Sequence, residues 1–222
     1  MATPPNIYII GSQCTGKTTL VNALSAHFSQ HPPPAPAAAP GVIKEVARHV
    51  LKKHAITRGD LRSSPARALE LQQLIIDAQS EAETAQLAAH RGAWFISDRS
   101  VLDPVVYARR YVSREAADVL TASEGWIAMR GRMARSLVVV CEAGVDWGLV
   151  DDGVRLMPLD GAEWWQTHAE FCTALADVGL EYHILPSGVG STEERVQFVL
   201  ARWEERRKEL VINGGEHEHA KA

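Results

Sequence analysis

No hydrophobic run in this chain approaches the roughly 18 consecutive apolar residues that a membrane-spanning helix needs. The N-terminus lacks the charged segment and the cleavage site of a secretory signal, and a glycine-rich motif begins at Gly11. We therefore expect a cytoplasmic protein without a membrane segment.

Cysteine is scarce, and basic residues are not in excess. The three cysteines, Cys14, Cys141 and Cys172, show neither C-x-x-C pairing nor metal-ligand spacing, which favours a reducing compartment. The formal net charge is -4, so the chain has no overall attraction for nucleic acid, and a nucleic-acid partner is not expected. No feature of the sequence specifies an oligomeric state.

The 222 residues, 46% of them hydrophobic, suit one α/β domain. Short apolar runs alternate with helical patterns, which predicts a three-layer sandwich around a five-stranded parallel sheet. The predicted strands are 7–10, 42–44, 94–97, 137–141 and 182–185. The clearest predicted helices are 65–89, 103–111, 162–178 and 192–210. We expect a single domain over residues 1–212, with a lid at about 143–160 and a disordered tail at 213–222.

The most specific pattern is Gly-x-x-x-x-Gly-Lys-Thr at residues 11–18, between a predicted strand and a predicted helix. The glycines let the backbone turn tightly and direct its N–H groups at phosphate oxygens, next to the positive end of the following helix. Lys17 is expected to reach the β- and γ-phosphates of ATP or GTP, and Thr18 to bind Mg²⁺. The alternative, a chance glycine-rich turn, is disfavoured by this context. The expected nucleotide-binding residues are Gly11, Ser12, Gln13, Cys14, Thr15, Gly16, Lys17, Thr18 and Thr19.

An aspartate ends the third predicted strand. In phosphate-loop folds such an acid lies beside the loop and holds Mg²⁺, so Asp98 is the expected second metal ligand and a catalytic residue. The alternative is that Asp98 only caps the next helix.

Glu45 and Arg48 follow the second predicted strand. Ligands of parallel sheets lie beyond the carboxyl ends of the strands, so Glu45 is expected to face the same crevice as Lys17. Glu45 could accept the proton of an attacking hydroxyl group, and Arg48 could bind an anionic or hydroxyl group of the acceptor. An ordinary Glu–Arg pair on a first helical turn explains these residues equally well.

The predicted lid contains a tryptophan and an arginine. Arg155 would close over the transferring phosphoryl group, and Trp147 would stack on a flat ring of the substrate. Alternatively, Trp147 packs the lid itself and Arg155 pairs with Asp151 or Asp152.

Four segments together carry a family resemblance: GSQCTGKTTL, KEVARHVL, FISDRSVLDPVVYA and DWGLVDDGVRL. The chain resembles the NadR/Ttd14-type AAA domain family, which includes the ribosylnicotinamide kinase domain of bacterial NadR, from residue 7 to about residue 210. The resemblance implies a P-loop kinase fold with strand order 2-3-1-4-5 and a small-molecule phosphoryl acceptor, with nicotinamide riboside as one candidate.

The same resemblance bears on two further segments. Asp-Arg-Ser at residues 98–100 is similar to the Glu-Arg-Ser element of deoxyribonucleoside kinases, which implies that Arg99 touches the acceptor. In P-loop kinases the loop after the last strand wraps the nucleotide base, which implies that role for Pro186 and Gly188. A plain connecting turn explains this proline and glycine equally well.

Two polar groups have simpler explanations. Three residues in the middle of the predicted helix 65–89 are expected mainly to form a solvated face, although they could bond a sugar or base: Gln72, Gln73 and Asp77. A basic cluster before the fourth strand is best explained as a solvated helix end: Arg130, Arg132 and Arg135.

The leading hypothesis is a kinase that transfers the γ-phosphoryl group of ATP or GTP to a hydroxyl group of a nucleoside-like metabolite, with Mg²⁺ as cofactor. The main alternative is a nucleotide-dependent regulatory protein that recognises a lipid or protein partner and has no acceptor substrate.

Overall fold

The computed structural model describes residues 3–34, 38–144, 158 and 160–219. The predicted lid residues Trp147 and Arg155 lie outside the described residues. Five strands form the sheet: β1 (Ile7–Ile10), β2 (Gly41–Ile43), β3 (Phe95–Asp98), β4 (Leu137–Cys141) and β5 (His183–Leu185). The described helices are α1 (Lys17–Gln30), α2 (Val46–Lys53), α3 (Arg58–Ser63), α4 (Pro65–Ala88), α5 (Leu102–Tyr111), α6 (Arg114–Thr121), α7 (Glu124–Met133), α8 (Gly161–Asp177) and α9 (Thr192–His219).

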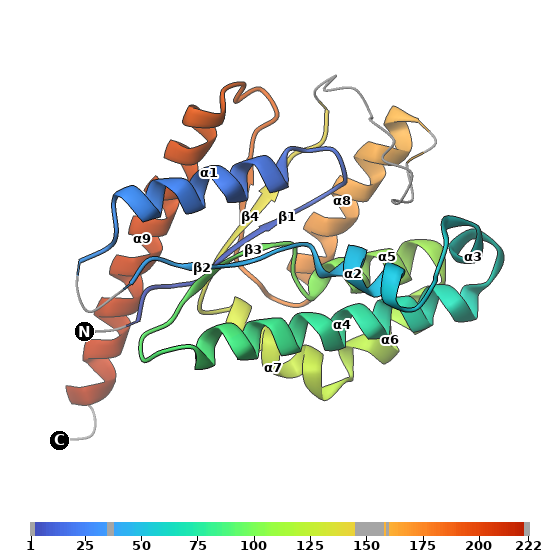
Figure 1. The fold of residues 1–222 in the computed structure, drawn as a ribbon, viewed down its shortest axis with the longest axis horizontal. Coiled ribbons are helices and arrows are strands. Elements are labelled where there is room, and N and C mark those ends of the chain that lie inside the picture. Colours follow the sequence, from blue (N-terminus) through green and yellow to red (C-terminus); the bar gives the residue numbers. More distant parts are fainter. Residues whose placement is uncertain (1–2, 35–37, 145–157, 159, 220–222) are drawn as a thin grey trace.

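The strands are all parallel and lie in the order β2-β3-β1-β4-β5, which confirms the predicted fold class and strand order (Figure 1). In the register of the two central neighbours, Ile9 of β1 lies opposite Asp98 of β3. The carboxyl end of β1, where the phosphate motif begins, therefore lies beside the carboxyl end of β3.

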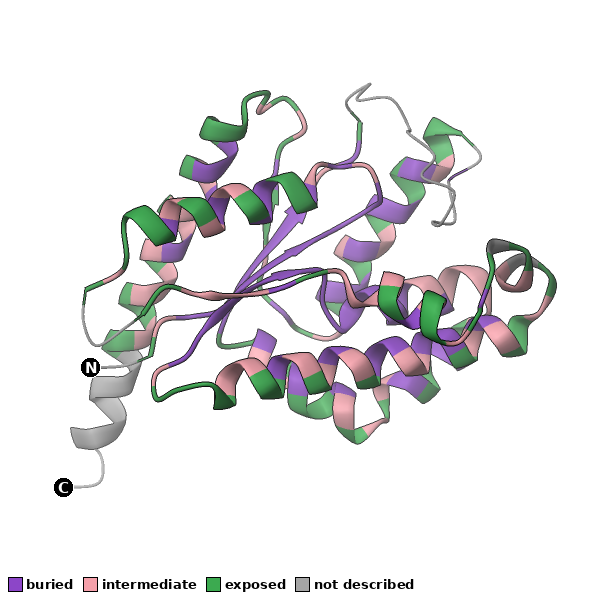
Figure 2. Ribbon diagram, viewed as in Figure 1, coloured by how far each residue is buried: buried purple, intermediate pink, exposed green. Residues whose placement is uncertain are grey.

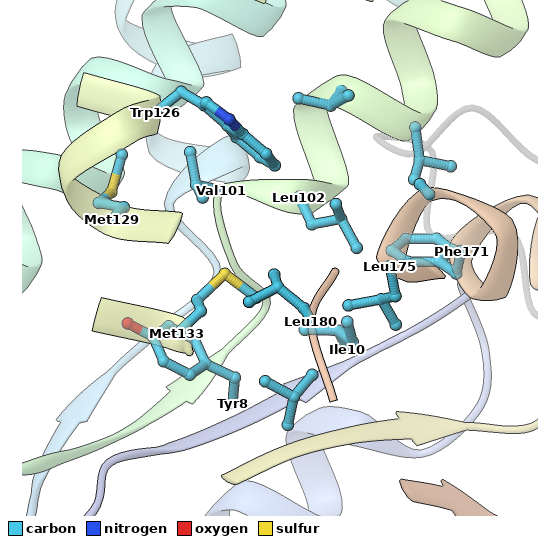
Figure 3. Close-up of a cluster of buried hydrophobic side chains, with 14 of the residues drawn as sticks. Tyr8, Ile10, Val101, Leu102, Trp126, Met129, Met133, Phe171, Leu175 and Leu180 are labelled. Carbon is cyan, nitrogen blue, oxygen red and sulfur yellow. The ribbon is translucent and has the colours of Figure 1, made fainter. Parts of the chain in front are cut away.

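Both faces of the sheet are covered, as the continuous apolar runs predict (Figure 2). Because side chains alternate along a strand, Ile7 and Ile9 pack with the side chains of α1 and α9, whereas Tyr8 and Ile10 pack on the opposite face. That opposite core is closed by α5, α7 and α8, and Figure 3 shows part of it. Its labelled side chains are Tyr8, Ile10, Val101, Leu102, Trp126, Met129, Met133, Phe171, Leu175 and Leu180.

A third apolar cluster lies away from the sheet, where α2 packs on α4. Its buried members are Val50, Ile56, Leu71 and Ile75. This cluster holds α2 and α3 against the long helix and so forms the outer wall of the cavity described below.

The starts of three predicted helices are confirmed by their caps. Ser64 accepts a hydrogen bond from the Arg67 backbone N–H, with a proline in the first turn of α4, and Asp160 caps α8 in the same way. Ser191 and Glu194 form a reciprocal capping box ahead of α9.

The last helix extends further than the sequence predicts. We expected it to end at about residue 210, but α9 continues to His219. A disordered tail at residues 213–222 stays a prediction. Extending an existing helix costs far less than nucleating one, so polar residues can continue it. Among the described residues, no helix combines the length and apolar character that crossing a membrane requires.

Candidate active site

The phosphate motif forms a tight loop between β1 and α1. Gly11 has φ 122° and Gly16 has φ 77°, both in the region that favours glycine, and Cys14 shares it with φ 59°. A Cβ atom at Gly11 would lie 2.7 Å from the Cys141 carbonyl oxygen, so only glycine fits there. The loop has the backbone conformation that the motif predicts, at the N-terminus of α1.

The loop is held in place from the far end of the chain. Arg195, on the first turn of α9, donates from Nη2 to the Thr15 carbonyl oxygen at 2.8 Å and is only 8% exposed. Its guanidinium group also lies 3.4 Å from the Cys141 sulfur. This contact could not be predicted from local patterns, because 180 residues separate the two partners.

Lys17 is buried beneath the loop. Its ammonium group donates to the Ser12 carbonyl oxygen and, at 3.3 Å, to the Thr15 hydroxyl. Burial, followed by the positive charge of Arg99, lowers the pKa of Lys17 from 10.5 to about 8. A buried ammonium group in this position gains most from an anionic partner such as a phosphate.

Thr18 and Asp98 lie side by side. The Thr18 hydroxyl donates to Asp98 Oδ2 at 2.5 Å, because the strands that precede them are neighbours in the sheet. Val101 rather than Asp98 stands at the start of α5, so the alternative role of Asp98 as a helix cap is not found. One hydroxyl and one carboxylate oxygen fit Mg²⁺, which takes few protein ligands and keeps waters and phosphate oxygens.

A second cluster of charges surrounds Arg99. This guanidinium group donates to Glu45 Oε1 at 2.8 Å and to Asp103 Oδ1 at 2.9 Å. Arg48 donates to the other oxygen of Glu45 at 2.9 Å, so the predicted Glu45–Arg48 pair is present and Arg99 extends it. The two carboxylates outweigh the effect of burial and raise the pKa of Arg99 well above its ordinary value.

Arg99 also has an unusual backbone. Its φ is 86°, a left-handed conformation that costs about 1–3 kcal/mol for a residue with a side chain. The contacts with Glu45 and Asp103, together with the Ser100 groups that donate to Asp103, hold Arg99 in this conformation. Strained conformations of this kind concentrate at functional sites.

A cavity of about 100 Å³ adjoins the charges around Arg99 and reaches Gln13 of the phosphate loop. One wall is apolar and comes from α2, α3, α4 and the start of α5: Val46, Ala47, Leu51, Leu61, Ala68, Leu71, Ile75 and Pro104. The other wall is polar: Gln13, Glu45, Gln72, Gln79, Arg99, Ser100, Asp103, Tyr107 and Tyr111.

Gln13 belongs both to the phosphate loop and to the cavity wall. Its side-chain oxygen accepts a hydrogen bond from the Tyr107 hydroxyl at 3.0 Å, and its backbone carbonyl oxygen accepts one from Trp164 Nε1 at 2.7 Å. The cavity therefore opens directly onto the phosphate loop.

Three other predicted residues have different surroundings. Pro186 borders a small hollow with Cys14 and Thr15, next to the phosphate loop, whereas Gly188 is exposed and does not border it. Thr19 is exposed at the start of α1.

Some functional candidates were missed or misplaced by the sequence. Gln72 is 7% exposed and lines the cavity, so its assignment to a solvated face was wrong, whereas Gln73 and Asp77 do pair with each other on the surface. Asp103 and Tyr107 were recognised only as part of a helix. The remaining signal was their spacing: positions 103 and 107 share one face of α5.

Comparison with known proteins supports this architecture. Residues 6–195 match the model of a family described as an AAA domain. None of the curated proteins compared matches the sequence.

Among solved structures, NadR in complex with NR has a TM-score of 0.65 and 22% sequence identity over 93% of this chain. This chain spans about half of that one, at 52% of its length. Thymidylate kinase from Candida albicans has a TM-score of 0.56 and 14% identity, over 92% of this chain and 93% of its own. Deoxyadenosine kinase from M. mycoides with bound dATP has a TM-score of 0.55 and 10% identity, over 90% of this chain and 99% of its own. The chain thus has the fold of the P-loop kinases.

Proposed function

Because the chain belongs to the AAA domain family, as its motifs predict, we propose that it transfers the γ-phosphoryl group of ATP or GTP to a hydroxyl group of a nucleoside-like metabolite. The observation that supports this proposal is the position of Gln13, which belongs to the phosphate loop and also lines the cavity. Two substrates bound in these sites would meet at the loop, and phosphoryl transfer depends chiefly on such positioning.

The described residues divide between the two sites. Lys17 would neutralise the phosphate oxygens, and Thr18 and Asp98 would hold Mg²⁺, which when bound stabilises the negative charge on the phosphates. Glu45 would orient the acceptor hydroxyl group and receive its proton, held in place by Arg99.

The loops around the nucleotide complete this assignment. Pro186 and Gly188 would border the base, since Pro186 adjoins the phosphate loop. Residues 143–160 would act as a lid, with Arg155 on the transferring phosphoryl group and Trp147 on the acceptor. Arg48, which donates a hydrogen bond to Glu45, would hold that carboxylate in place.

The charges of the cavity favour a nucleoside over a nucleotide as the acceptor. Among the residues of the lining that the structure describes, and apart from the tyrosines, the ionisable ones are Glu45, Asp103 and Arg99, which gives two carboxylates for one guanidinium. A phosphate monoester requires an excess of positive charge, usually from arginine. A neutral or cationic ligand, nicotinamide riboside included, suits the present charges better.

Incubation of the purified protein with radiolabelled ATP or GTP and Mg²⁺ tests the proposal. The acceptor panel would include nucleosides, nicotinamide riboside and nucleoside monophosphates, with Lys17→Ala as the inactive control. Labelled product from a nucleoside supports the proposal, and product from monophosphates alone would contradict the acceptor class. Tight nucleotide binding without any labelled product would favour the regulatory alternative.

A further inference from the structure

A buried polar network lies behind the cavity wall and takes no part in the proposed transfer. Its centre is Glu83 on α4, which has no solvent exposure. Glu83 Oε2 accepts hydrogen bonds from the Tyr8 hydroxyl at 3.0 Å and from the Arg132 guanidinium group. Arg132 was expected on a solvated helix end, but it reaches inward to this carboxylate.

Gln79 connects this network to the cavity. Its side chain is 1% exposed and lines the cavity one helical turn before Glu83. The Gln79 amide nitrogen donates to Glu83 Oε1 at 2.9 Å and to the Ser97 hydroxyl at 3.1 Å. Both N–H groups of the amide are therefore in use.

The chemistry of Glu83 determines which way this amide points. A carboxylate that is paired with an arginine can only accept hydrogen bonds, so the nitrogen of Gln79, and not its oxygen, must face Glu83. The opposite orientation would put two oxygen atoms in contact without a proton between them. Within the part of the chain that the structure describes, no group donates to the Gln79 carbonyl oxygen.

We infer that Gln79 is a specificity-determining residue whose carbonyl oxygen accepts a hydrogen bond from the acceptor substrate, and that Glu83 is the positioning residue that fixes this orientation. The cavity wall then favours ligands that carry an N–H or O–H donor at this point and disfavours ligands that place an oxygen there. Because it concerns the acceptor, the inference rests on the proposed function.

Gln72 provides the contrast on the same helix. It precedes Gln79 by seven residues, about 10 Å along the helix axis, and also lines the cavity. No described residue forms a hydrogen bond with its amide, so nothing fixes its orientation and it can offer either a donor or an acceptor. Of these two glutamines, only Gln79 should therefore distinguish a donor from an acceptor on the ligand.

Competition between matched acceptors tests the inference. Two pairs differ by one donor group: adenosine and purine riboside, and adenosine and 2′-deoxyadenosine. In two further pairs a donor is replaced by an oxygen acceptor: the amino group of cytidine by a carbonyl in uridine, and the amide of nicotinamide riboside by the carboxylate of nicotinic acid riboside. For each pair the measured quantity is the ratio of the two kcat/KM values, together with the ratio of dissociation constants in the presence of AMP-PNP. A loss of folded protein lowers the apparent kcat/KM of both acceptors in a pair equally, so their ratio is unchanged.

In the wild type at least one pair should favour the donor-bearing acceptor by roughly tenfold to a hundredfold. Gln79→Met, which removes the carbonyl group, should bring that ratio close to one. Glu83→Gln should also lower the ratio, because an amide at position 83 can form a hydrogen bond with the Gln79 amide in either orientation. In the Gln79→Met background, Glu83→Gln should change the ratio no further.

Gln73→Met is the matched control, since Gln73 lies on the surface of the same helix and bonds only Asp77. Its ratios should equal those of the wild type. The inference is overturned if the Gln79→Met ratios match the wild type for every pair, or if no acceptor binds. If acceptors bind with the expected ratios but none is phosphorylated, the proposed function fails and the inference on Gln79 stands.

Discussion

The pH dependence of nucleotide binding is a direct test of the role of Lys17. Burial and the charge of Arg99 lower its pKa from 10.5 to about 8 in the free protein. At about 1.4 kcal/mol per pH unit, the difference between 10.5 and about 8 corresponds to about 3 kcal/mol. A bound phosphate favours the charged ammonium, so nucleotide should raise this pKa again.

The direction of the pH effect on affinity follows from the protonation of Lys17 with and without bound nucleotide. Well below pH 8 Lys17 is charged with and without nucleotide, so affinity does not vary with pH through this group. Above pH 8 the free protein loses a proton that the complex keeps, so affinity should fall by up to about tenfold per pH unit. The contribution to folding has the opposite trend: the penalty for burying the charge is full below pH 8 and disappears as the pH rises toward 10.5.

Calorimetric titration with AMP-PNP between pH 7 and 9.5, in two buffers of different ionisation enthalpy, measures both the affinity and the proton uptake. Any proton exchanged by the terminal phosphate of the ligand is common to the wild type and the variant below, so it cancels in their comparison. At pH 8 Lys17 should add an uptake of about half a proton. Lys17→Arg is the control, because a guanidinium stays charged throughout and should lack this added uptake. Constant wild-type affinity over this range, or an equal decline in Lys17→Arg, would refute the reasoning.

Three further predictions concern the same site. Glu45→Gln should slow transfer by roughly a hundredfold while nucleotide affinity is unchanged; wild-type turnover would return Glu45 to a structural role. Asp98→Asn should weaken the Mg²⁺-dependent part of nucleotide binding by about tenfold or more in metal titrations, with binding in EDTA unaltered. Gly11→Ala should lower the free energy of unfolding in urea by more than Gly92→Ala does. Both glycines have positive φ, but only the Gly11 methyl group would meet a neighbour, the Cys141 carbonyl oxygen.

Local patterns were enough to predict the sheet and the phosphate loop. The strands are continuous apolar runs, and all residues of the motif at 11–18 lie in one loop and the first helical turn that follows it. The contact between Thr18 and Asp98 was also predictable, because both follow neighbouring strands of a known type of parallel sheet.

The cavity was harder to predict because its walls come from helices far apart in the sequence. Gln79 and Glu83 lie on a helix with a weak apolar stripe, and their burial depends on Tyr8 and Arg132, which approach from other elements. Polar residues that are buried in pairs resemble surface residues when each is considered alone. For the same reason Arg132 was assigned to the solvent.

The contact between Arg195 and the Thr15 carbonyl oxygen has a consequence for biosynthesis. Within this chain, the side chain that supports the phosphate loop is translated 180 residues after the loop itself. During synthesis the loop must therefore wait for the other strands and the helices between them before its native support exists. Truncations that remove the start of α9 should impair the phosphate loop, although the loop lies far upstream of the cut.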